Sequence, residues 1–142
     1  LDALSSAADV LDQGRALGIF PEGTRSKRTE APFLLPGKTG VARLAASYPN
    51  SVVVPIALLG TRAMMQPQKH KLPRLYKRIT IQAGEGVTWY QWLTDVNGGN
   101  QSAASLKELA EKEEHEIRGE LASMYRRFTD QLMGSILALG AP

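Results

Sequence analysis

The side chains best suited to bind a ligand or take part in a reaction stand together at positions 20–26, Phe-Pro-Glu-Gly-Thr-Arg-Ser. A short apolar run at 16–20 leads into this segment and is typical of a buried parallel strand. Pro21 would end that strand, and Gly23 permits the backbone angles of a tight turn. Arg25 would then lie beyond the carboxyl end of the strand, where open α/β sheets bind ligands. Because a guanidinium holds phosphate or carboxylate through two parallel hydrogen bonds, we predict an anion site here.

Two neighbours add polar groups to this segment. Glu22 could brace Arg25 or bond a sugar-like hydroxyl, and Thr24 adds a second hydroxyl group to that of Ser26. The alternative is an ordinary turn with a surface ion pair.

A second anion-binding element follows at Gly37-Lys38-Thr39, which opens a predicted helix. Free amides at a helix amino terminus attract anions, and Lys38 stands beside them. The same three residues close the nucleotide-binding P-loop, but Pro32 stands where that motif requires glycine, and no strand leads directly into the loop. The pattern therefore predicts an anion site and disfavours a nucleoside triphosphatase.

Three segments in this order resemble the glycerolipid acyltransferases, whose best-known members are the 1-acyl-sn-glycerol-3-phosphate acyltransferases. Residues 20–26 resemble the third sequence block of that family, 54–56 (Val-Pro-Ile) the fourth, and 36–45 the helix start between them. The resemblance covers about 3–86. It implies an α/β fold, with a mostly parallel or mixed sheet flanked by helices and a long carboxyl-terminal helix.

The resemblance also implies an activity and roles for residues. A fatty acyl group would pass from acyl-CoA or acyl carrier protein to the free hydroxyl of 1-acyl-glycerol-3-phosphate, with no cofactor and no metal. Arg25, helped by Lys38, would hold the acceptor phosphate. Three residues would bind or brace the rest of the acceptor: Glu22, Gly23 and Thr24. Three residues would line the acyl chain, although they could equally be plain core: Val54, Pro55 and Ile56.

The catalytic base of that family is absent from the sequence. The family carries a His followed five positions later by Asp, together with a second block that is also missing here. His70 has Leu75 at that spacing, and His115 has Glu120, which stands about 140° around a helix from it. We therefore expect the chain to be the carboxyl-terminal portion of an acyltransferase domain, inactive by itself, with its base supplied from upstream.

Charge is distributed unevenly along the chain. Positions 15–78 hold twelve Lys and Arg against Glu22 and Glu30, a balance of +10, and the rest of the chain has a balance of −7. Such a basic segment attracts phosphates on a lipid, on coenzyme A or on a membrane surface. Nucleic acid is disfavoured, because the aromatic residues are not interleaved with the cations. We expect a protein at the cytoplasmic face of the cell membrane, peripheral or anchored through an upstream part.

The chain has no cysteine, which excludes disulfides and thiolate nucleophiles.

The remaining sequence predicts an alternating order of helices and strands. Pro55 should place its strand at an edge or in a bulge. The final helix should pack on the core, because its polar face is rich in Glu, and it should break near Gly119. We expect the acyltransferase α/β portion over 1–96 and a helical extension over 97–142. The predicted elements are a helix from Ser5 or Ser6 to Gln13, a strand at 16–20, a loop at 21–36, a helix at 38–47, strands at 52–59 and 78–83, and a helix at 103–139.

Overall fold

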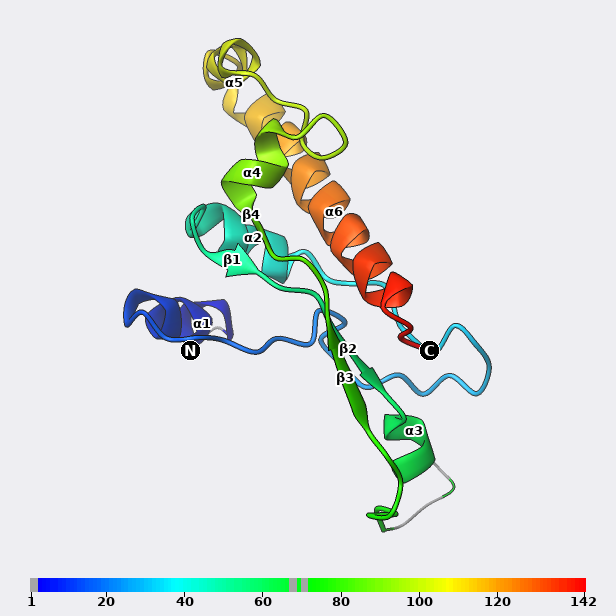
Figure 1. The fold of residues 1–142 in the computed structure, drawn as a ribbon. Helices are drawn as coiled ribbons and strands as arrows, with labels where there is room; N and C mark the ends of the chain where they lie inside the picture. Colours follow the sequence, from blue (N-terminus) through cyan, green and yellow to red (C-terminus); the bar gives the residue numbers. More distant parts are fainter. Residues whose placement is uncertain (1–2, 67–68, 70–71) are drawn as a thin grey trace.

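The computed structural model describes residues 3–66, 69 and 72–142 (Figure 1). His70 lies outside the described residues. None of the helices within those ranges is long and apolar enough to cross a membrane. The helices are α1 Ala3–Asp12, α2 Gly40–Ser47, α3 Thr61–Met64, α4 Trp89–Thr94, α5 Ala103–Ala110 and α6 Glu114–Ala138; the strands are β1 Val52–Val53, β2 Ile56–Leu59, β3 Thr80–Ala83 and β4 Val87–Thr88.

Helix α6 is the axis of the molecule, and Figure 1 shows it as a long rod with α2 and α4 beside it. The prediction that the final helix packs on the core is confirmed, since four apolar residues spaced one turn apart form a buried stripe: Met124, Phe128, Leu132 and Ile136. The Phe128 ring lies 5.3 Å from that of Trp89 and 5.2 Å from that of Trp92, measured between centroids. These aromatic contacts hold α4, which the sequence analysis did not anticipate, against α6.

The predicted single final helix is broken, but the predicted position of the break is wrong. The chain leaves helical geometry after α5 and begins α6 at Glu114, and Gly119 lies inside α6. Glu113 is the N-cap residue of α6: its amide donates to Oε2 of the Glu116 side chain at 3.3 Å, and the Glu116 amide donates to the Glu113 carbonyl at 2.9 Å. A capping box fixes a helix start, whereas one exposed glycine weakens a helix by only about 1 kcal/mol.

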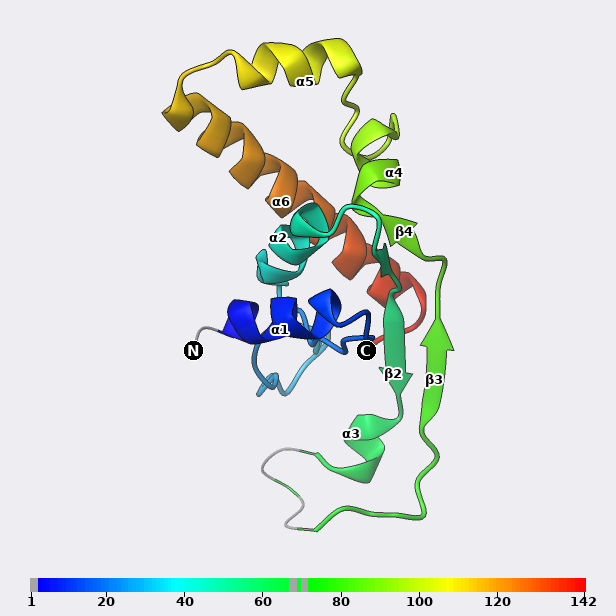
Figure 2. The ribbon, with the colours of Figure 1, turned by 90° about the vertical axis from the view of Figure 1, so that its left-hand side faces the viewer.

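The strands in the described ranges form antiparallel pairs, which corrects the prediction of a mostly parallel or mixed sheet. β1 pairs with β4, and β2 pairs with β3. Figure 2 shows β2 and β3 side by side in a narrow ladder that extends away from α6 and has α3 at its far end. The predicted strand at 52–59 is interrupted at 54–55, because Pro55 has no amide hydrogen for the ladder. The α/β class is therefore retained, with a different sheet topology.

The predicted strand at 16–20 is not formed. Positions 15–20 are extended without strand pairing, and the Phe20 side chain is 73% exposed. A strand requires hydrogen bonds to a neighbour, and the strands in the described part of the chain pair only with one another. The segment therefore serves as a linker between α1 and the turn that follows.

Helix α1 begins earlier than predicted and is fixed to α2 at its far end. Ser5, where the helix was predicted to begin, lies inside it, and Gly14, at φ +67°, follows its end. The Tyr48 hydroxyl donates to Asp12 Oδ1 at 2.7 Å and to the Ala8 carbonyl at 3.2 Å. The hydrogen bond to Asp12 raises the pKa of Tyr48 above its ordinary value, with smaller effects from burial and the negative charges of Asp12 and Asp9.

Candidate functional site

The predicted anion site is built on a tight turn that contacts the start of α2. The Gly23 amide donates to the Phe20 carbonyl at 3.0 Å, and the Lys38 amide donates to the Pro21 carbonyl at 2.7 Å. Gly23 has φ +67°, which favours glycine. A Cβ atom on Gly23 would lie 3.1 Å from Lys38 Nζ. The structure thus brings two predicted site residues together, with the Lys38 amine directly over the turn.

Glu22 braces the loop and does not brace Arg25. Its Oε2 atom accepts a hydrogen bond from the Leu35 amide at 2.6 Å, and its side chain is half-buried. This contact joins the beginning of the long loop at 21–36 to its end. A carboxylate that accepts from a backbone amide makes a strong, charge-assisted hydrogen bond, so the turn has a fixed position relative to α2.

Arg25 and Thr24 are exposed on the outer side of this turn. In the ranges that the structure describes, the Arg25 side chain makes no hydrogen bond or ion pair with the protein. The described residues therefore leave all five of its donors available for a ligand. Its role in phosphate binding stays a prediction.

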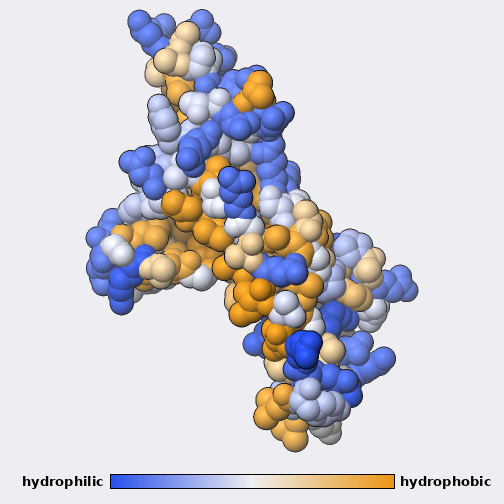
Figure 3. Space-filling view, in the orientation of Figure 1, coloured by the Kyte–Doolittle hydropathy of each residue, from blue (hydrophilic) through white to orange (hydrophobic). Residues whose placement is uncertain are grey.

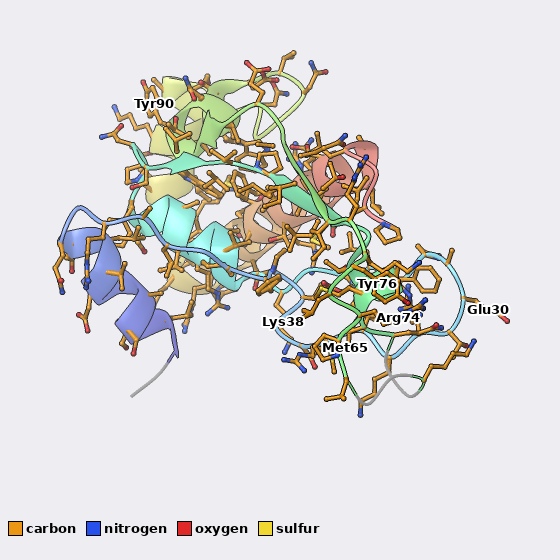
Figure 4. The ribbon with its side chains drawn as sticks, turned by 60° about the horizontal axis from the view of Figure 1, so that its bottom comes forward. Glu30, Lys38, Met65, Arg74, Tyr76 and Tyr90 are labelled. Carbon is orange, nitrogen blue, oxygen red and sulfur yellow. The ribbon has the colours of Figure 1, made fainter. Side chains whose placement is uncertain are left out.

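Two arginines that the sequence analysis missed hold the rest of the loop. Arg28 Nη1 donates to the carbonyls of Pro32 at 2.8 Å and Leu34 at 3.1 Å. Arg62 from α3 donates to the Arg28 carbonyl at 3.1 Å, and its guanidinium lies 3.7 Å from the Phe33 ring centroid. In the stick view Glu30 points away on the outer side of this loop, and Lys38 lies on its inner side (Figure 4). No local pattern could have paired Arg62 with a loop so distant in sequence.

The end of the loop is anchored to α6 through Gly37. This residue is buried, and a Cβ atom on it would lie 2.8 Å from side-chain atoms of Met133 and Thr129. Arg126 donates to the Gly37 carbonyl at 2.9 Å while binding both carboxylate oxygens of Asp130. Ion pairs four positions apart, such as Arg126 and Asp130, are common on helices, so no local pattern links this pair to Gly37. Lys38 therefore projects from a backbone that α6 holds in place.

The three residues predicted to line the acyl chain do not share a face. Val54 is 45% and Ile56 48% exposed, whereas Pro55 is buried on the other side, as alternation along an extended chain requires. Pro55 lines a small hollow with Phe128 and Leu132 of α6. On the open side, Ile81 of β3 extends the apolar face that Val54 and Ile56 begin. Figure 3 shows apolar side chains gathered along this part of the molecule.

Comparison with known proteins bears on the amino-terminal part of the sequence. The model of the family described as Acyltransferase matches residues 1–59, which include the turn, the Lys38 helix start and the Val-Pro-Ile segment. No curated protein and no solved structure matches the chain significantly. The family match agrees with the resemblance to the glycerolipid acyltransferases over residues 1–59, and it supports a general function in acyl transfer.

Proposed function

We propose that this chain takes part in the transfer of a fatty acyl group to the free hydroxyl of a 1-acyl-glycerol-3-phosphate, which yields phosphatidic acid for phospholipid synthesis. The acyl donor is acyl-CoA or acyl carrier protein. One observation carries the proposal: the Lys38 amine lies over the turn at Gly23, and Arg25, whose donors the described residues do not use, is close to Gly23 in the sequence. These residues lie within the segment that the acyltransferase family model matches. Two cations at a fixed turn suit a phosphate monoester.

In this proposal the chain positions the acceptor. Arg25 and Lys38 hold its phosphate, Gly23 and Thr24 contact its glycerol portion, and Glu22 braces the turn. Val54 and Ile56 offer an open apolar surface to the acyl chain, while buried Pro55 contributes only rigidity. When the acceptor hydroxyl is held in line with the acyl donor, the reaction is faster because the binding energy has already offset the entropy of orienting the two reactants.

The chemistry itself requires a base from outside this sequence. A His oriented by Asp would remove the proton of the acceptor hydroxyl, and the oxygen would attack the thioester carbonyl. The carbon–sulfur bond then breaks, and the thiolate leaves with the proton that the His returns. We expect no turnover from this chain alone, since it has no His-x4-Asp block. We also propose that the protein works at the cytoplasmic face of the cell membrane, where its substrates reside.

Two alternatives share the same site. The acceptor could be glycerol-3-phosphate or a larger glycolipid, or the chain could be a lipid-binding module without catalysis. The family match to acyltransferases favours an enzyme. A His-x4-Asp block in the upstream sequence would distinguish the enzyme from the binding module.

The test is a binding panel on the chain, read by calorimetry. We expect a short-chain 1-acyl-glycerol-3-phosphate to bind more tightly than glycerol-3-phosphate, because it also covers Val54 and Ile56, and far more tightly than a phosphate-free monoacylglycerol. Arg25→Lys should weaken binding of the phosphate ligand by roughly 1–2 kcal/mol, a modest loss because the site is exposed. Arg15→Lys is the matched control, since Arg15 is exposed outside the turn. Equal effects of the two variants would remove Arg25 from phosphate binding.

A further inference from the structure

A lobe projects from the molecule at the far end of the β2–β3 ladder. We define the hairpin lobe as the described residues between Thr61 and Ile79, which comprise α3 and the return to β3. Figures 1 and 2 show that this lobe stands away from α6 and from the other helices. The lobe therefore meets solvent on most of its surface, and packing in the hydrophobic core does not account for its residue types.

The lobe carries the most exposed large apolar side chains in the described part of the chain. Leu75 is 83%, Leu72 79% and Tyr76 74% exposed, and Met65 and Ile79 add partly exposed apolar surface. Figure 3 shows an apolar group at the lower end of the molecule, with hydrophilic residues above it. Apolar side chains gathered at one tip mark an interaction site.

The charged residues of the lobe are all cations. Its described basic residues are Arg62, Lys69, Arg74, Lys77 and Arg78, and positions 60–79 of the sequence contain no Asp or Glu. A tip that combines leucine, an aromatic residue and unopposed cations is typical of elements that lie in the interface of an anionic bilayer. The opposite end of the molecule, α5 and the start of α6, is rich in Glu.

Hydrogen bonds hold the turn that presents this tip. The Arg74 amide donates to the Met64 carbonyl at 2.8 Å, and the Lys77 amide donates to the Arg74 carbonyl at 3.1 Å. Arg74 Nε donates to the Tyr76 hydroxyl at 2.8 Å, and Lys77 Nζ lies 5.1 Å from the Tyr76 ring centroid. Figure 4 shows Arg74 and Tyr76 beside each other with Met65 near them. Tyr76 is thus held as an amphipathic ring between two cations, which suits a headgroup region.

We infer that the hairpin lobe binds the surface of an anionic bilayer, with Leu72, Leu75 and Tyr76 entering the interface and the lobe's cations meeting lipid phosphates. A projecting tip fits a soft bilayer better than it fits the surface of an acidic protein, which would need a matching concavity. The inference rests on the proposed function only for its choice of a lipid partner. Binding to vesicles needs no turnover, so its failure is distinguishable from a failure of acyl transfer.

The direct test places a reporter at the tip. Because the chain has no cysteine, the variant Leu75→Cys can be labelled at that single position with an environment-sensitive fluorophore, which we term the tip label. Val96→Cys carries the control label, since Val96 is 73% exposed in the turn after α4, away from the lobe. We expect vesicles of phosphatidylcholine with about one third phosphatidylglycerol to shift the emission of the tip label to the blue, and to bind about tenfold more tightly than pure phosphatidylcholine vesicles. The emission of the control label should not move.

Two double variants separate the apolar contribution from the ionic one. Leu72→Asp with Leu75→Asp should reduce vesicle binding at least tenfold, whereas Tyr90→Asp with Val96→Asp, which adds the same charge elsewhere, should reduce it far less. Lys77→Gln with Arg78→Gln should abolish most of the preference for anionic vesicles, and Lys107→Gln with Arg118→Gln should retain it. Circular dichroism confirms that each variant is folded.

Several outcomes would overturn the inference. They are an absence of vesicle binding, binding that leaves the emission of the tip label unchanged, or equal losses in the lobe variants and their controls. A blue shift of the tip label on adding acyl carrier protein, with none on adding vesicles, would identify the lobe as a docking surface for an acidic protein instead.

Discussion

Three arginines near the loop at 21–36 have different roles, although their side chains are chemically identical. Arg28 and Arg62 donate hydrogen bonds to carbonyls of the loop, whereas Arg25 donates none to the described residues. These bonds tie separate parts of the loop and α3 together, so the first two arginines are structural. Only an arginine that the protein does not use can give its full set of hydrogen bonds to a ligand.

At the same scale, Glu22 is predicted to stabilise the loop rather than to act on the substrate. Glu22→Ala should lower the free energy of unfolding by about 1–2 kcal/mol, because the Leu35 amide loses a charged acceptor. Glu22→Gln keeps an oxygen in place and should lose less than half of that amount. Urea denaturation measures both variants, and a fully stable alanine variant would contradict the bracing role.

Among the elements, the packing of the long loop on α6 depends on one glycine. Gly37→Ala places a methyl group 2.8 Å from atoms of Met133 and Thr129, and we expect it to cost about 1–3 kcal/mol of stability. Gly119→Ala is the matched control, since a Cβ atom there meets nothing within 4 Å on the exposed face of α6. That variant should gain about 0.5–1 kcal/mol. Thermal melts of the two should therefore shift in opposite directions.

The attachment of α1 to α2 depends on Tyr48. Tyr48→Phe removes the donor to Asp12 and Ala8, so the amides of α1 should exchange their hydrogens faster while those of α6 do not change. Because the folded pKa of Tyr48 is raised, the contact contributes below the ordinary value of 10.0 and is lost as pH rises through the folded pKa. The phenylalanine variant should lack this alkaline loss. Tyr90→Phe, on an exposed tyrosine, serves as the control.

On the scale of the whole molecule, the sheet leaves an apolar face uncovered. Val52, Val54, Ile56 and Ile81 are all exposed, and the two-stranded pairs have unpaired edges among the described residues. Such faces and edges favour association. We expect the chain to have marginal stability and to self-associate, with a melting temperature that depends on concentration.

Sedimentation and melts over a range of concentrations measure this association. Ile56→Lys with Ile81→Lys should return the chain to a monomer, because two charges on the face oppose its burial. Tyr90→Lys with Val96→Lys adds the same charge away from the sheet and should not. A clean monomer from the unmodified chain, with a sharp melting transition, would contradict the expectation.

Local sequence determined several parts of this protein by itself. The stripe of α6 follows from residues spaced one turn apart, the end of α1 from Gly14, and the interruption of the 52–59 strand from Pro55. The acyltransferase blocks were readable for the same reason, since each is a contiguous run of residues. In all these cases the cause lies within a few positions of its effect.

Only the tertiary structure decided the rest, because those features depend on contacts between distant segments. The apolar run at 16–20 has the composition of a strand, but no described strand pairs with it. The sheet is antiparallel because β2 and β3 are joined through the hairpin lobe, and Glu22 meets Leu35 across a loop. Arg126 reaches Gly37 from far along the chain, and this distant contact positions Lys38 over the turn that is proposed to bind phosphate.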